Sequence, residues 1–314
     1  VRALLVRGAD VRALNLPGEN LRALDGCEVE RVAGDVTERD TMKRAMRGRD
    51  VVFHLAAVYA LWTRDGGRRM REVNVDGTRI VLEAAREVGV RRVVHTSSIA
   101  RFGGQGMHRR ATEASAFALG WTGDPYSASK HAAHEIAVDA AREQDVVIVA
   151  PCGPIGPGDV GPTPTGRLLL SALNMPVVLA APTMTNFIDV RDCAEGHVLA
   201  AERGVRGETY LLGHRDLWMR EIAEIALRAA GMRKPILEAP FPAAEPLSMP
   251  PQWRTIRHCC SSRSGTMRRG RSAWTPKSAP AVWPAMPASH PRRRRWRGAR
   301  FCSQACATRG IRPG

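Results

Sequence analysis

The sequence predicts an α/β fold in which helices cover both faces of a doubly wound parallel sheet. From Val1 to about Ala150, short β-branched runs alternate with stretches whose apolar residues recur every three or four positions. Strands that alternate with helices of about 10 to 20 residues are typical of parallel sheets. The predicted strands are Val11–Leu14, Val29–Ala33, Val51–Leu55, Arg92–Thr96 and Val146–Ala150, and the predicted helices are Glu38–Met46, Met70–Val88 and Tyr126–Glu143.

The first element is out of order for such a fold. Val1–Gly8 indicates the end of a helix, with Gly8 as its stop signal. A doubly wound sheet ordinarily begins with a strand and a glycine-rich turn, and no G-x-x-G-x-x-G or G-x-G-x-x-G follows a strand near the start. We therefore expect a truncation of roughly 20 residues, a sheet that lacks its first strand, and neighbouring strands with unpaired edges.

The chain divides into three parts by pattern. Residues 1–150 form the predicted sheet domain, and residues 151–244, rich in Pro and Gly, form a smaller lobe at the carboxyl edge of the sheet. Residues 245–314 lose all periodicity and are predicted to be an irregular, disordered tail. Within the smaller lobe, the predicted strands are Asn186–Val190 and Glu208–Leu212, and the predicted helices are Arg191–Arg203 and Leu217–Gly231.

The net charge of +16 belongs almost wholly to the tail. Residues 245–314 hold 15 Lys and Arg against one acid, Glu245, together with nine prolines and four tryptophans. This mixture is typical of a GC-rich gene read in the wrong frame, because disordered tails are usually poor in Trp and Cys. A basic tail that contacts nucleic acid and an unstructured solvated tail stay open as alternatives. Since the rest of the chain is nearly neutral, a nucleic-acid partner is not the leading expectation.

Cysteine usage and hydropathy favour a cytoplasmic protein. The seven cysteines are an odd number, and no secretory leader is recognisable, which favours reduced thiols. No stretch approaches the roughly 18 apolar residues of a membrane span. Cys302-x-x-x-Cys306, with His290 nearby, lacks the second ligand pair of a zinc finger, so no metal site is predicted.

The strongest chemical signal is Pro125-Tyr126-Ser127-Ala128-Ser129-Lys130. Tyr126 and Lys130 stand four residues apart at a helix start and therefore project from one face. An ammonium in that position favours the phenolate and lowers the pKa of a tyrosine toward working pH, which suits a general acid and base. By itself Tyr-x-x-x-Lys is a weak signal, since two surface residues produce the same spacing.

A second signal strengthens the first. The strand Arg92–Thr96 runs into Ser97 and Ser98, and hydroxyls at the carboxyl end of a strand face the ligand crevice of an open α/β sheet. Ser98 is therefore predicted to hold a substrate oxygen beside Tyr126. The alternative is that both serines cap a helix or form a turn.

Together these motifs resemble the extended short-chain dehydrogenase/reductases, the NAD-dependent epimerase/dehydratase group with a Rossmann-like fold. The resemblance covers about residues 1–242 and is closest to hopanoid-associated sugar epimerases and dihydroflavonol reductase-like proteins. The segments that carry it are Val73-Asn74-Val75-Asp76-Gly77-Thr78, Thr96-Ser97-Ser98, Tyr126-x-x-x-Lys130, Ala56–Asp65, Pro154–Asp159 with Pro162–Arg167, and Asp192–His197.

The resemblance implies a cofactor, NAD or NADP, and a small-molecule substrate, with a homodimer left open. It also implies an incomplete dinucleotide-binding domain at residues 1–150 and a substrate-binding lobe at 151–244. The catalytic residues it implies are Ser98, Tyr126, Lys130 and Asn74, the last as support for a proton relay through a kinked helix. The implied cofactor-binding residues are Asp35, Val36, Leu55, Ala56, Ala57, Thr96, Lys130, Pro151 and Gly153.

Bland alternatives accompany several of these roles, because Asp35 could cap the next helix, Asn74 could be merely polar, and the prolines could only shape a loop. Leu14-Asn15-Leu16-Pro17 offers neither an acid for a ribose hydroxyl nor an arginine for a 2′-phosphate, so the choice between NAD and NADP stays open.

Three functional hypotheses follow. The leading one is an epimerase or reductase acting on a sugar or related hydroxyl/ketone compound. The others are a dihydroflavonol-reductase-like carbonyl reductase and a non-catalytic remnant that binds the cofactor poorly, because the amides that hold a pyrophosphate are missing.

Overall fold

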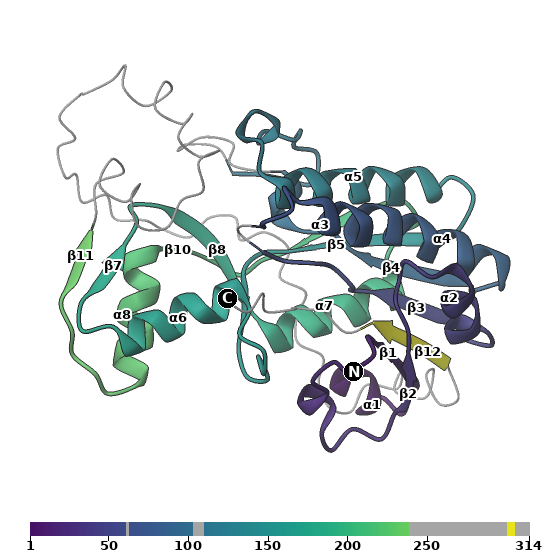
Figure 1. Ribbon diagram of the computed structural model, residues 1–314, viewed down its shortest axis with the longest axis horizontal. Helices are drawn as coiled ribbons and strands as arrows, with labels where there is room; N and C mark the ends of the chain where they lie inside the picture. Colours follow the sequence, from purple (N-terminus) through teal and green to yellow (C-terminus); the bar gives the residue numbers. More distant parts are fainter. Residues whose placement is uncertain (61–62, 103–109, 239–299, 305–314) are drawn as a thin grey trace.

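The computed structural model describes residues 1–60, 63–102, 110–238 and 300–304. Its larger lobe is a sheet of seven parallel strands in the order β2-β1-β12-β3-β4-β5-β9, covered by helices on both faces (Figure 1). The strands of the larger lobe are β1 (Asp10–Asn15), β2 (Glu30–Ala33), β3 (Val51–His54), β4 (Arg92–Thr96), β5 (Val146–Pro151), β9 (Thr209–Leu212) and β12 (Arg300–Gln304). The predicted fold class is therefore confirmed.

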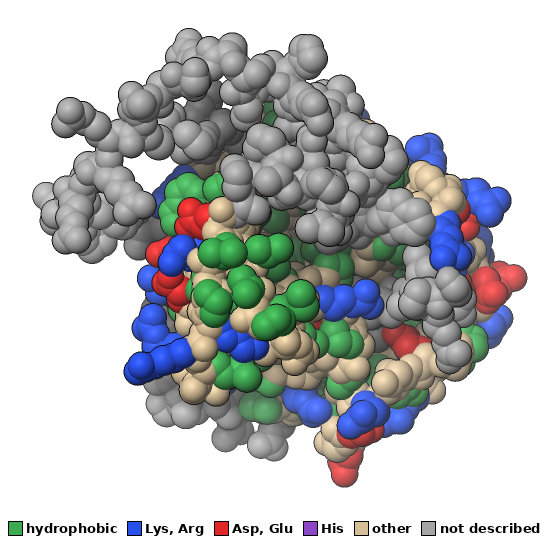
Figure 2. Space-filling view, turned by 60° about the vertical axis from the view of Figure 1, so that its left-hand side comes forward, with side chains coloured by type: hydrophobic (Ala, Val, Ile, Leu, Met, Phe, Trp, Pro, Cys, Tyr) green, Lys and Arg blue, Asp and Glu red, His purple; other side chains and the backbone are tan. Residues whose placement is uncertain are grey.

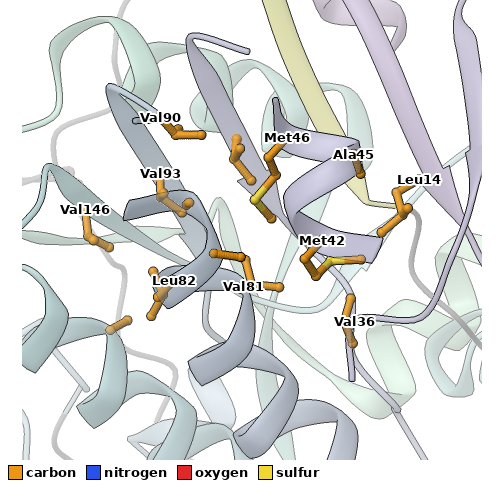
Figure 3. Close-up of a cluster of buried hydrophobic side chains, with 14 of the residues drawn as sticks. Leu14, Val36, Met42, Ala45, Met46, Val81, Leu82, Val90, Val93 and Val146 are labelled. Atoms are coloured by element: carbon orange, nitrogen blue, oxygen red, sulfur yellow. The ribbon is translucent and has the colours of Figure 1, made fainter. Parts of the chain in front are cut away.

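One face of the sheet carries the helices that were predicted from apolar periodicity. Buried valines of β3, β4 and β5 pack there against Met42, Met46, Val81 and Leu82 (Figure 3). The elements on this face are α2 (Arg39–Met46), α3 (Arg68–Arg71), η2 (Glu72–Asp76), α4 (Gly77–Glu87), η3 (Ile99–Arg101), η4 (Gly120–Thr122) and α5 (Pro125–Ala140). The longer helices α2, α4 and α5 contribute apolar residues to this core, as the sequence pattern requires.

The opposite face packs against α1 (Arg2–Leu5) and α7 (Val190–Arg203). Leu4 of α1 and Val198 of α7 join the alternate residues of the strands, such as Val51 and Val147, in a second core. Because both faces are buried, a central strand such as β5 is apolar along its whole length rather than alternating. The expected opening helix is present, and Gly8 follows it with a positive φ of 73°.

The expected gap in the sheet is absent from the structure. Strand β12 lies between β1 and β3 and pairs with both in parallel, with Cys302 in register with Arg12 on one side and Val52 on the other. The prediction that the neighbours of the first strand have unpaired edges is therefore wrong. Within the predicted irregular tail, residues 300–304 form β12 and provide partners for backbone groups of β1 and β3, and the remainder of the tail lies outside the described residues.

The smaller lobe contains two short sheets, in the orders β10-β8-β6 and β11-β7. Its core includes Val178, Phe187 and Leu227, and Figure 2 shows hydrophobic side chains gathered on the face of the molecule that contains this lobe. The elements of this lobe are β6 (Pro154–Ile155), α6 (Pro164–Asn174), β7 (Val178–Ala180), β8 (Met184–Asp189), β10 (Arg215–Trp218), α8 (Met219–Ala229) and β11 (Ile236–Glu238).

One strand expected in the smaller lobe belongs elsewhere. Strand β9 extends the large sheet beside β5, with Tyr210 in register with Val149, and α7 covers it. Apolar periodicity identifies a strand but not the sheet that it joins, which explains the error. Among the helices that the structure describes, none is both long and apolar enough to cross a bilayer.

Candidate active site

The predicted site residues follow the carboxyl ends of neighbouring parallel strands. Asp35 comes after β2, Leu55 after β3, Ser98 after β4 and Gly153 after β5. Because these strands are parallel, their carboxyl ends share one edge of the sheet, and the residues line up along it. The residues to which the sequence analysis gave site roles therefore lie along one edge of the sheet.

Helix α5 begins with a well-formed cap that fixes Tyr126. The carboxylate of Asp124 accepts from the backbone amides of Tyr126 at 3.3 Å and Ser127 at 2.9 Å, and Pro125 occupies the first turn. Gly67, at φ 89°, lies against Pro125 so closely that a Cβ would come within 2.5 Å of the proline side chain. The start of α5 is thus held by its own cap and by the turn that begins α3.

Lys130 is buried beneath the end of β4. Its side chain is 4% exposed, and Nζ donates to the carbonyl oxygen of Thr96 at 2.7 Å. The hydroxyl of Thr96 lies on the opposite face, 3.0 Å from Nε2 of His197. The ammonium is therefore fixed one helical turn from Tyr126 and at the strand end that leads into Ser98, where a desolvated charge acts strongly on its neighbours.

Asn74 lies in a π-helical turn, η2, that interrupts the predicted helix Met70–Val88. Its amide oxygen accepts from the backbone of Val58 at 2.7 Å, and its amide nitrogen donates to Val58 O and to Ser129 Oγ, both at 3.0 Å. Ser129 in turn donates to the carbonyl of Tyr126 at 2.8 Å. Asn74 thereby links the loop after β3 to the first turn of α5, and π-turns of this kind are frequent at functional sites.

The two serines at the end of β4 have different surroundings. Ser97 is buried, and its Oγ lies 3.1 Å from Nδ1 of His134. Ser98 is half-buried, and its Oγ accepts from the backbone of Ala100 at 3.2 Å, which caps the short helix η3. The capping alternative is therefore realised for Ser98, although its hydroxyl hydrogen stays available to a substrate oxygen because a cap uses only an acceptor lone pair.

Three buried histidines lie under Lys130. Nε2 of His54 is 3.0 Å from the hydroxyl of Thr78, whereas neither ring nitrogen of His95 has a hydrogen-bond partner among the described residues. Burial lowers the pKa of His95 well below its usual value, and the neighbouring positive or protonatable groups act in the same direction. Burial likewise lowers the pKa of His134 to about 3. The imidazoles of His95 and His134 are thus held neutral by their surroundings.

Tyr59 is a site residue to which sequence reasoning gave no role. Its ring lies against that of Tyr126, with centroids 4.6 Å apart and planes tilted by 38°. Burial raises the pKa of its phenol, a hydrogen bond with Thr165 of α6 opposes that shift, and the Asp124 carboxylate adds to it. Tyr59 therefore joins α5 to the smaller lobe. Its neighbours Leu61 and Trp62 in the same motif lie outside the described residues.

The adenine side of the predicted site is partly engaged by the protein itself. Asp35 accepts from the amide and hydroxyl of Thr37 at 2.9 and 2.8 Å and pairs with Arg69 at 2.8 Å. Burial acts to raise the pKa of Asp35, but these hydrogen bonds and the Arg69 charge outweigh it and lower that pKa. The side chain of Val36 packs into the core against Gly77, so only its backbone faces the edge.

The other predicted cofactor residues shape the edge through their backbones. Leu55 packs against the core on the face of α1 and α7, Ala56 packs against the core on the face of α2, α4 and α5, and Ala57 is buried. Pro151 ends β5, and Gly153 has φ 24°, where a Cβ would meet the carbonyl oxygen of Asn186 at 2.8 Å. Glycine is therefore required at position 153 for the loop to pass under the smaller lobe.

The described residues fit a dinucleotide only in part. At one end, the fixed ammonium of Lys130 and the close-packed loop at Gly153 suit the nicotinamide side. At the other, a pyrophosphate is ordinarily held by the amides of a glycine-rich turn and a helix N-terminus. Among the described residues the spacing G-x-G-x-x-G occurs at Gly156–Gly161, between β6 and α6 of the smaller lobe, and not directly after a strand of the seven-stranded sheet. No group of metal-binding side chains is found among the described residues either, and of the Cys302/Cys306/His290 pattern both Cys306 and His290 lie outside them.

Comparison with known proteins agrees with this architecture. The chain matches the NAD dependent epimerase/dehydratase family over residues 1–213, more than half its length, and belongs to that family. The resemblance inferred from the motifs is thus confirmed, and a nicotinamide cofactor is the one that the family uses.

Several curated relatives are reductases by name. The chain is 38% identical to a Synechocystis sp. protein provisionally named dihydroflavonol 4-reductase, over 75% of this chain and 69% of that protein. It is 36% identical to sterol demethylase protein B of Methylococcus capsulatus, over 76% and 73% of the two chains. It is also 31% identical to cinnamoyl-CoA reductase 1 of Arabidopsis thaliana, over 72% and 69%.

Solved structures share the fold. The crystal structure of gox2253 matches with a TM-score of 0.69 at 34% identity, over 76% of this chain and 73% of that one. A dTDP-glucose 4,6-dehydratase of Streptomyces venezuelae with NAD bound matches with a TM-score of 0.67 at 25% identity, over 76% and 79%. The NAD complex of Thermus thermophilus UDP-glucose 4-epimerase, at 24% identity and a TM-score of 0.67 over 77% and 82%, shows the fold alone.

Proposed function

We propose that the chain is an NAD(P)-dependent oxidoreductase or epimerase that acts on a sugar or related hydroxyl/ketone compound through Tyr126, Lys130 and Ser98. The observation that carries the proposal is the fixed ammonium of Lys130, buried and held at 2.7 Å by Thr96, one turn along α5 from Tyr126. The charge of a buried lysine acts strongly on the groups beside it. Tyr126, one helical turn away on α5, is the proposed acid and base on which it acts.

In the proposed mechanism each residue has a separate task. Bound NAD or NADP would supply or accept the hydride. Ser98 would donate its hydroxyl hydrogen to the substrate oxygen and orient it toward Tyr126. The phenol of Tyr126 would give its proton to a carbonyl oxygen or take one from a hydroxyl, and the Lys130 ammonium would favour the phenolate. Asn74 would keep the first turn of α5 in place through Ser129.

The rest of the edge would hold the cofactor. Lys130, Thr96 and the Pro151–Gly153 loop would flank the nicotinamide, Leu55–Ala57 would line the middle, and Asp35–Val36 would meet the adenine. No glycine-rich turn directly follows a strand of the seven-stranded sheet among the described residues. This supports a weak grip on the phosphates, so the activity of this chain is proposed to be impaired rather than lost.

A carbonyl reductase of the dihydroflavonol reductase type is the second candidate. It is favoured by the identities of 38% and 31% to proteins that bear reductase names. The two candidates differ in cofactor balance. A reductase consumes one NAD(P)H for each product, whereas an epimerase returns the cofactor to its starting state within each turnover.

The test uses the full chain at millimolar NAD(H) or NADP(H), with UDP-glucose and a dihydroflavonol as separate substrates. Tyr126→Phe is expected to lower kcat by about 10²–10⁴-fold, because it removes the general acid and base. Tyr210→Phe is the matched control. Tyr210 lies in β9, and its hydroxyl accepts from the backbone amide of Val205, so its removal is expected to leave kcat unchanged. Equal rates for wild type and Tyr126→Phe would refute the proposed function.

A further inference from the structure

We propose that the space between β1 and β3 is a strand-acceptor slot, and that its occupant is the chain's own segment Arg300–Gln304. We call this space the strand slot; it is bounded by residues 10–14 of β1 and 51–53 of β3. Filling the strand slot completes the seven-stranded sheet. It does not rest on the proposed function, and its test needs neither cofactor nor substrate.

The first support is geometric. Strand β12 is the one strand between β1 and β3 in the sheet, so β1 and β3 do not pair with each other. Val11 of β1 and Val51 of β3 both have Phe301 as their register partner. With a strand spacing of about 4.8 Å, the two walls stand about 10 Å apart, which is the width of one strand.

The second support is the character of the walls. Val11, Ala13, Val51 and Phe53 are at most 3% exposed, and Val52 is fully buried. Strands that end a sheet usually carry lysine, proline or bulges that discourage pairing, and the two walls have no such protection. Arg12 is the charged residue at the middle of β1, and Glu30 and the Ala45 carbonyl hold its guanidinium on the side of β2 and α2.

The third support is the occupant's register. Five consecutive residues of β12 are in register with β1 and three with β3, and the strand runs parallel to both. Such an approach requires a long connection from the smaller lobe back to the amino edge of the sheet. In the sequence, residues 239–299 separate β11 from β12. A connection of this length is long enough, because a chain spans up to roughly 3.3 Å per residue. The segment that closes the sheet therefore comes from the far end of the sequence.

The insertion has a consequence for the candidate site. A parallel β12 ends at the same edge as β3 and β4, where Leu55 and Ser97 begin the loops of the site. Removing the inserted strand would separate β1 and β2, with Asp35, from the part of the edge that carries Ser98 and Lys130. The slot thus couples the C-terminal segment to the integrity of the site.

Hydrogen exchange measured by mass spectrometry on the full chain tests the insertion directly. Amides of residues 300–304 are expected to exchange about 10³-fold or more slowly than in the same synthetic peptide alone, because a central strand opens only with the whole sheet. Unprotected amides at 300–304 alongside protected β1 and β3 would overturn the proposal. So would protection found only in a dimer, since the occupant would then come from a second copy.

Two variants keep the test sharp. Cys302→Pro removes an N–H in the middle of β12 and is expected to abolish protection of 300–304 and to reduce that of β1 and β3. Cys302→Ala, which removes the thiol but keeps the N–H, is expected to leave protection unchanged. A peptide of residues 297–307 added in excess to the Cys302→Pro chain is expected to restore protection of β1 and β3, whereas the same peptide with proline at 302 is not. No restoration by the intact peptide would contradict the slot.

Discussion

At the scale of single residues, the candidate site depends on side chains whose positions are fixed by partners distant in sequence. Lys130 is held by Thr96, and Asn74 reaches both Val58 and Ser129. The spacing of Tyr126 and Lys130 could be predicted because it is set within one helix. The bridging role of Ser129 could not, since it depends on the approach of η2 to α5. Asp124 was within reach of sequence reasoning, because an acid before proline at a helix start is a capping signal.

The buried histidines predict a pH dependence of stability. The pKa of His134 is about 3 in the folded protein, below an unfolded value near 6.5, because burial disfavours its charged form. The stabilisation is therefore present above pH 6.5 and is lost as pH falls toward 3, since the unfolded chain binds the proton that the folded chain refuses. Urea unfolding should show a loss of about 2 kcal/mol from this residue between pH 6.5 and pH 5.

The variant His134→Asn isolates that contribution. Its free energy of unfolding is expected to fall less steeply with decreasing pH than that of the wild type, because asparagine does not bind a proton in either state. Burial lowers the pKa values of His95 and His197 as well, so part of the slope should remain. Identical slopes in the two proteins would show that His134 does not titrate as its surroundings require.

At the scale of elements, the pattern of apolar residues located most helices and strands of the larger lobe. It missed the π-turn η2, because a change in backbone hydrogen bonding leaves the apolar spacing of Met70–Val88 intact. It also placed β9 in the wrong sheet, because a strand's partner is decided by long-range packing. The short turn before α3 received no prediction, yet it positions the start of α5 through Gly67.

Two adjacent glycines test that contact. Gly67→Ala puts a Cβ within 2.5 Å of Pro125 at φ 89°, whereas Gly66→Ala has a similar φ of 65° but open space around its Cβ. Both should lose stability from the left-handed backbone, by about 1–2 kcal/mol. Gly67→Ala should lose about 1–3 kcal/mol more through overpacking. Thermal unfolding measures the difference, and equal melting temperatures for the two variants would rule out a tight contact with α5.

At the scale of the whole molecule, a nearly neutral body carries a strongly basic C-terminal part, and the sheet is completed from within that part. Composition revealed the charge division. It could not reveal β12, because Arg300–Gln304 has no periodic flanks and its pairing depends on strands formed by residues about 250 to 290 positions earlier. The sequence has no glycine-rich turn after a strand near its start. The weak cofactor binding that we expect from this is a property of the whole molecule.

Isothermal titration of residues 1–314 with NAD(H) and NADP(H) measures that consequence. We expect dissociation constants well above the micromolar range, because among the described residues no glycine-rich turn directly follows a strand of the seven-stranded sheet, where its amides could hold the pyrophosphate. Titration at two salt concentrations separates specific binding from attraction of phosphates to the basic tail, which weakens steeply with salt. Micromolar affinity that persists at high salt would contradict the expectation.

The most direct test of the central claim follows a labelled hydride. The full chain and Tyr126→Phe are each incubated with a dihydroflavonol as ketone substrate and with NADH or NADPH deuterated at the transferred hydride, at concentrations that the titration shows to be saturating. Deuterium at the carbon that carried the carbonyl is then measured in the product by mass spectrometry. The account predicts label transfer by the wild type and a fall of about 10²-fold or more in Tyr126→Phe. Equal transfer by both proteins, or none by the saturated wild type, would contradict it.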